Sequence, residues 1–92
     1  MGPNLVVVHL DPWLKEFGAA LRVDLPAANV GSLVDGLEER YPRLKGRLRD
    51  ETGELRRFIR LFINGESVDW DGGSKTLAPG DRVDLLHSIA GG

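Results

Sequence analysis

The sequence predicts an α+β fold in which one main helix covers a mixed, four- to five-stranded sheet. Three observations lead to this prediction. A short β-branched apolar run lies near the N-terminus, a later segment has helical periodicity, and an Asn-Gly pair follows an alternating stretch. The 92 residues, of which 41% are hydrophobic, suit a single domain over residues 1–92.

The N-terminal segment predicts two antiparallel strands joined by a short helical turn. Residues 5–10, LVVVHL, predict a strand that is buried on much of both faces. Asp11 can cap the turn that follows, Pro12 suits its first position and Gly18 its end. Because the connection is short, the next strand should pair antiparallel with the first. That strand lies in residues 20–26 and has one apolar face: Leu21, Val23 and Leu25.

Residues 29–42 predict the main helix. Asn29 is a favourable N-cap, and Pro42 ends the helix because the residue before a proline avoids the α region. Gly31 and Gly36 each weaken a helix by about 1 kcal/mol relative to alanine, so packing must hold it together. The apolar positions recur at helical spacing and predict the buried face: Val30, Leu33, Val34, Leu37 and Tyr41.

The C-terminal half predicts a hairpin and a last strand. Asn64-Gly65 supplies the positive φ angles of a type I′ turn between residues 59–63 and a short partner strand at 66–69. Pro79-Gly80 forms a turn before the last strand. On that strand Leu86 faces away from Val83 and Leu85, as Phe62 faces away from its apolar neighbours on the hairpin strand. If the helix covers the larger apolar sets, Phe62 and Leu86 lie on the open face of the sheet.

The order of elements, ββαβ(β)β, is in outline the β-grasp arrangement of ubiquitin-like proteins. A right-handed crossover through the helix is expected to return the chain beside the first strand and parallel to it. The last strand then lies in mid-sheet, and residues 87–92 leave it as a flexible, solvent-exposed arm. Phe62 and Leu86 beside this arm would suit the groove of a partner protein. The alternative is that both are ordinary scattered surface apolar residues.

Few side chains suit catalysis or metal binding. The absence of cysteine removes thiolate nucleophiles and Cys-ligated metal sites. His9 and His87 are far apart in the sequence, and neither has an evident orienting partner, so we expect no metal site and no Ser-His-Asp arrangement. The chain is therefore not expected to be an enzyme, although a pH-switch role for His87 stays open.

The basic residues are concentrated in one segment. Residues 40–60 hold eight of the 12 basic residues and three acidic ones, a net charge of +5 against −7 elsewhere. A solvated face around a loop or a docking patch for an acidic protein would explain this. Nucleic acid is not expected as a partner, because the pI is 5.6 and no aromatic residues interleave for base stacking. With no apolar run of about 18 residues and no signal peptide, we expect a cytoplasmic protein with no membrane partner.

The last residues, HSIAGG, end on Gly91-Gly92. Glycine permits the closest passage of a backbone through a partner protein. A terminal carboxylate becomes reactive when ATP converts it to an acyl-adenylate, from which a nucleophile displaces AMP. With no cysteine in the chain, activated sulfur could be held only on that carboxylate.

Three stretches, IRLFINGE, LAPGDRVDLL and IAGG, together resemble the MoaD/ThiS family of ubiquitin-like sulfur carriers. Within it, DETGELRRF and WDGGSKTLAPGD look most like the carrier of thiocarboxylate-dependent cysteine biosynthesis. His87 departs from the family, since many members have proline there. Losing proline frees φ and adds an N–H donor, so the arm is expected to be less stiff than in relatives.

The resemblance implies a mechanism and a set of partners. A ubiquitin-activating-type adenylating enzyme would use ATP to activate the Gly92 carboxylate, with Ile89, Ala90 and Gly91 entering its active site. A sulfur donor would then form a thiocarboxylate, which passes sulfur to an enzyme making cysteine, molybdopterin, thiamine or a thio-modified product. The carrier itself would bind no cofactor. Two alternatives are a protein modifier joined through Gly92 to lysines, and a scaffold whose tail is inert.

Overall fold

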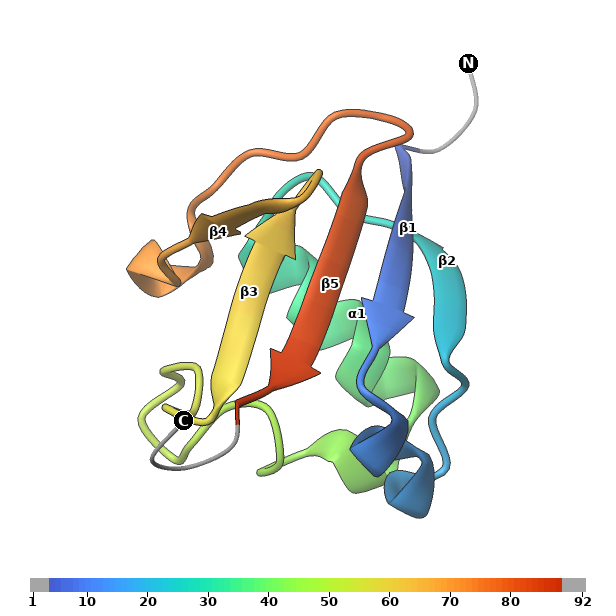
Figure 1. The fold of residues 1–92 in the computed structure, drawn as a ribbon, viewed down its shortest axis with the longest axis vertical. Coiled ribbons are helices and arrows are strands. Elements are labelled where there is room, and N and C mark those ends of the chain that lie inside the picture. The colour runs from blue at the N-terminus through green and yellow to red at the C-terminus, as the bar shows by residue number, and fades with distance from the viewer. Residues whose placement is uncertain (1–3, 89–92) are drawn as a thin grey trace.

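The computed structural model describes residues 4–88 and shows a five-stranded mixed sheet with one main helix behind it (Figure 1). The strand order is β2-β1-β5-β3-β4. This confirms the predicted α+β class and β-grasp outline. The elements, in chain order, are β1 (Leu5–Leu10), η1 (Pro12–Phe17), β2 (Arg22–Pro26), α1 (Val30–Arg40), η2 (Pro42–Leu44), β3 (Ile59–Ile63), β4 (Glu66–Val68), η3 (Asp71–Gly73) and β5 (Arg82–His87), where η denotes a 3₁₀ helix.

The last strand lies in the middle of the sheet, as expected. β5 is parallel to β1 on one side and antiparallel to β3 on the other. The expected return of the chain beside β1 and parallel to it is made by β5, since β3, the first strand after α1, lies on the far side of β5. β3 runs antiparallel to β5, so it is β5 that lies parallel to β1 (Figure 1).

The core lies between α1 and one face of the sheet. Alternate residues of β1, β3 and β5 are buried against the helix and are joined at one end by Leu14, Leu44 and Leu48. Two expectations about burial are wrong. β1 is buried on one face only, since Leu5 is 45% exposed and Val7 half-buried, because one helix can cover only one face of the sheet. Leu21 is 46% exposed because it precedes β2 and does not share its alternation.

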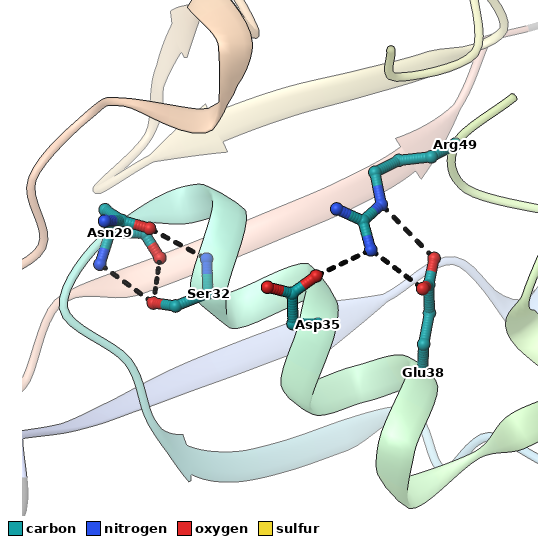
Figure 2. Close-up of polar contacts among 5 residues, drawn as sticks. All are labelled: Asn29, Ser32, Asp35, Glu38 and Arg49. Carbon is teal, nitrogen blue, oxygen red and sulfur yellow. Dashed lines mark hydrogen bonds and ion pairs between the residues drawn. The ribbon is translucent and has the colours of Figure 1, made fainter. Parts of the chain in front are cut away.

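The predicted turn and helix signals form local structures as expected. Asn64 and Gly65 have φ angles of 51° and 87°, and Ile63 pairs with Glu66 across the two-residue turn. At the start of α1, the Asn29 side chain accepts a hydrogen bond from the Ser32 N–H at 2.8 Å. The Ser32 hydroxyl accepts one from the Asn29 N–H at 3.2 Å (Figure 2). α1 ends at Arg40, one residue earlier than the residue before Pro42.

Arg49 ties the segment after α1 back to the helix. Its guanidinium donates to a carboxylate oxygen of Glu38 and to one of Asp35, each at 2.8 Å, and a second bond to Glu38 measures 3.3 Å (Figure 2). The bond to Glu38 is the largest cause that raises the pKa of Arg49 above its usual value, and the bond to Asp35 adds to it. One member of the basic segment is thus engaged within the fold.

Candidate functional site

β5 carries the chain to the predicted tail. His87 is its last residue and pairs with Ile59 of β3, so the predicted arm begins within the sheet. Ser88 is the last residue that the structure describes. Ile89, Ala90, Gly91 and Gly92 lie outside the described residues, so their exposure and their predicted roles stay predictions.

Asp11 holds the root of this tail with both of its carboxylate oxygens. Oδ1 accepts the N–H of Trp13 at 2.9 Å, which caps η1. Oδ2 accepts the N–H of His87 at 2.8 Å. On the other side of the chain, the Ser88 N–H donates to the carbonyl of Phe58 at 2.7 Å. The end of β5 is therefore hydrogen-bonded on both sides.

Four rings surround the same point, and we refer to Trp13, Phe17, Phe58 and His87 as the tail-root cluster. The His87 ring centroid lies 5.0 Å from that of Trp13, with the planes tilted by 31°, and 5.6 Å from that of Phe58. Trp13 contacts Phe17 and Phe58 edge-to-face, at 5.4 and 5.6 Å. The neighbours of the His87 ring come from η1 and from the loop before β3, which the sequence did not place beside it.

Sequence reasoning assigned Asp11 only its local role as a cap. Its second role depends on a residue that is 76 positions away, and no periodicity reports such a contact. The added N–H donor expected from the absence of proline at position 87 is present, but Asp11 already binds it. A signal was nevertheless available: an aspartate N-cap directly after a strand has a second oxygen free for a neighbouring strand.

The predicted docking residues lie on the face of the sheet opposite α1. Leu86 is 37% exposed and Phe62 is half-buried. They are diagonal neighbours, because Leu86 pairs with Arg60 while Phe62 pairs with Asp84. Near them the face is polar: Asp84 lies 3.0 Å from the Arg82 Nε and 3.6 Å from the His9 Nδ1. His9 thus lies beside a carboxylate that the sequence did not place near it.

Most of the basic segment contacts the protein itself. Within residues 4–88, Arg40 donates to the Asp24 carbonyl, Arg43 to the Glu16 carbonyl and Arg56 to the Gly46 carbonyl. The Arg47 guanidinium carbon lies 4.7 Å from the Phe17 ring centroid. These contacts favour the solvated-face interpretation of the charge cluster. An open groove of about 320 Å³ begins at Ser88 and includes among its lining residues Arg56, Arg57, Arg60 and Asp69.

The described part of the chain holds neither a metal-binding cluster nor a membrane-spanning helix. Between residues 4 and 88, no group of three or more His, Asp or Glu side chains is placed to hold a metal ion. Over the same residues, no helix has the length and apolar character needed to cross a membrane.

Comparison with known proteins identifies the family. Residues 13–92 match the family model described as ThiS family. The chain belongs to the ThiS family. This ThiS-family protein is 35% identical over 78 residues to the sulfur carrier protein CysO of Mycobacterium tuberculosis, an alignment that covers 82% of this chain and 84% of the relative.

Solved structures show the same fold. SAMP1 of Haloferax volcanii matches with a TM-score of 0.81 and 27% identity, over 96% of this chain and 99% of that one. A chain of the BexX/CysO complex of Amycolatopsis orientalis matches with a TM-score of 0.78 and 32% identity, over 95% and 99%. The ThiS-family protein is therefore a ubiquitin-like member of a sulfur carrier family, whose members are carriers rather than enzymes.

Proposed function

We propose that this ThiS-family protein carries sulfur as a thiocarboxylate on the C-terminal carboxylate of Gly92. One observation carries the proposal: a member of a sulfur carrier family has no cysteine among its 92 residues. Sulfur therefore cannot be held as a thiol or persulfide of this chain. The carboxyl group at the end of the tail is the group that remains for a transferable acyl–sulfur bond.

The chemistry divides between the carrier and a partner enzyme. A Gly92 carboxylate oxygen attacks the α-phosphorus of ATP bound to the adenylating enzyme, and pyrophosphate leaves. Sulfide then attacks the acyl carbon, AMP leaves, and the thiocarboxylate forms. When an acceptor takes the sulfur and water supplies oxygen to the acyl carbon, the carboxylate is restored. Every ATP-dependent step takes place in the partner, so the carrier needs only to present its terminus.

The fold supports such a presentation. β5 is hydrogen-bonded on both sides, and its end is held by Asp11 and Phe58, so the tail starts from a defined point. The five residues from Ser88 to Gly92 span about 17 Å when fully extended. Phe62 and Leu86, on the open face, are the residues that we propose dock the partner. The similarity to the CysO chain of a BexX/CysO complex supports a partner-dependent role.

The decisive test changes the position of the carboxylate and nothing else. Adding one alanine after Gly92 keeps a carboxylate but moves the reacting carbon by about 3.5 Å. Misplacement by about 1 Å can already cost about a hundredfold in rate where geometry controls reaction. We expect ATP–pyrophosphate exchange by the cognate adenylating enzyme to fall at least that far, with an unchanged thermal melt. Exchange at the wild-type rate would mean that the terminal carboxylate is not the site of adenylation. It would favour the alternative of a scaffold whose tail is inert.

A second function is favoured by one comparison. SAMP1, which shares the fold at 27% identity, is named a small archaeal modifier protein. The alternative is therefore a modifier joined through Gly92 to lysines of other proteins. Mass spectrometry of the protein from its native host separates the possibilities, as a thiocarboxylate, isopeptide-linked adducts or a plain acid. Among the pathways that could accept the sulfur, we place cysteine biosynthesis first. The sequences of residues 50–58 and 70–81 most resemble those of the carrier of that route.

A further inference from the structure

The end of β5 loses a strand partner, and a side chain replaces it. β1 pairs with β5 as far as Leu10 opposite Leu85, and the Asp11 N–H still donates to the Leu85 carbonyl at 2.9 Å. Beyond that point the chain of β1 turns into η1. The next β5 donor on this side, the His87 N–H, is bound at 2.8 Å by the Asp11 carboxylate instead of a backbone carbonyl.

This arrangement links the tail to two separate elements. The same carboxylate caps η1 through Trp13, whose ring packs on the His87 ring. On the opposite side, Phe58 accepts the Ser88 N–H and contacts the His87 ring. A strand end normally frays for lack of partners. Here the backbone is held as far as Ser88, three residues past the last position at which β1 and β5 pair.

We propose that Asp11 is a positioning residue for adenylation: it sets the direction in which the tail leaves β5 and thereby where Gly92 arrives in the partner. This inference rests on the proposed function. The docking face and the tail must engage the partner at the same time, so the direction of exit matters. A change of about 20° in that direction moves the end of a tail of about 17 Å by about 6 Å.

The test separates a positioning role of Asp11 from an effect on stability. The acceptor on Asp11 is removed first alone and then in a variant that also lacks the N–H donor at position 87. Asp11→Asn keeps the shape of the side chain, but Trp13 and His87 are bound by two different oxygens, and one of these becomes an NH₂ group that can only donate. We expect the kcat of ATP–pyrophosphate exchange to fall about tenfold, with little change in the KM for the carrier. In a His87→Pro background position 87 has no N–H, so Asp11→Asn should change kcat by less than about twofold.

Asp81→Asn is the matched control. Asp81 also uses both oxygens, accepting from the Ala78 N–H at 2.8 Å and the Asn64 amide at 3.0 Å, but it precedes the other end of β5. It should lower the melting temperature about as much as Asp11→Asn and leave kcat unchanged. Two outcomes would show that Asp11 acts only through stability. One is that Asp11→Asn lowers kcat equally in the wild-type and His87→Pro backgrounds, and the other is that Asp81→Asn lowers kcat as much as Asp11→Asn does.

The possible failures can be told apart. If the wild-type protein supports no exchange, the proposed function fails and the inference fails with it. If the wild type is active and Asp11→Asn is equally active, only the inference is overturned. If His87→Pro unfolds the protein, hydrogen exchange at the His87 backbone amide is measured in place of that variant. The amide should exchange faster in Asp11→Asn than in Asp81→Asn. Equal exchange rates would overturn the inference.

Discussion

Gly73 and Gly31 permit a contact that side chains would prevent. Gly73 has a φ of +80°, and a Cβ built on it would lie 2.7 Å from the Gly31 Cα. A Cβ on Gly31 would lie 3.2 Å from the Gly73 carbonyl oxygen. The two glycines let η3 approach the first turn of α1. Gly31, which weakens the helix when only its propensity is considered, thus also avoids a crowded contact with η3.

We predict that Gly73→Ala destabilises the protein by about 2–4 kcal/mol, from backbone strain at positive φ together with the clash against α1. Urea unfolding measures this. Gly53→Ala isolates the first cause, because Gly53 has a φ of +89° and nothing within 4 Å of its would-be Cβ, so about 1–2 kcal/mol is expected. Equal losses in the two variants would mean that the contact with Gly31 contributes nothing.

At the scale of elements, β3 and β5 together present the open face beside the tail. Phe62 on β3 and Leu86 on β5 are diagonal neighbours on that face, and neither belongs to the core beneath α1. Two neighbouring apolar side chains with polar residues beside them suit a transient interface, in which an apolar core has a polar rim and a few residues carry most of the binding energy.

We predict that replacing both Phe62 and Leu86 with aspartate abolishes adenylation while the protein still folds. The charges would be buried against the partner without compensation, whereas in the free protein they face solvent. Pyrophosphate exchange and a thermal melt report the two effects. Leu5→Asp is the control, since Leu5 is 45% exposed but lies at the start of β1, at the other end of the sheet from the tail (Figure 1). Unchanged adenylation in the double variant would remove these residues from the docking surface.

At the scale of the whole molecule, two carboxylates couple folding to pH. Hydrogen bonds lower the pKa of Asp50, the hydroxyl of Thr52 contributing most, and lower that of Asp81, the Ala78 N–H contributing most. Because the folded protein holds these groups ionised more strongly than the unfolded chain does, their stabilisation is fully present above the usual value of 3.8. This stabilisation is lost as the pH falls through the lowered pKa values of the folded protein.

We therefore predict that the melting temperature falls as the pH is lowered below about 4. The double variant Asp50→Asn with Asp81→Asn should be less stable at neutral pH and should show a shallower fall in acid. Melts by circular dichroism between neutral pH and the acid limb test this. Parallel curves for the variant and the wild type would show that other carboxylates govern the acid response.

Much of the fold and some of the site follow from local patterns. Asn29 and Pro42 bound the helix, Asn64-Gly65 makes the hairpin, and the alternation of residues 82–86 separates Leu86 from the core; all three could be predicted. The contact of Asp11 with His87 and that of Gly31 with Gly73 could not, because each joins residues that periodicity and turn chemistry treat separately.

What the sequence by itself determined is the set of elements, the class of fold and the features that indicate a sulfur carrier, because propensity, capping and alternation act over a few residues. Only the tertiary structure decided which face of β1 is open and what holds the root of the tail. These depend on the path of the chain between elements. β5 enters between β1 and β3 and brings His87 within reach of Asp11.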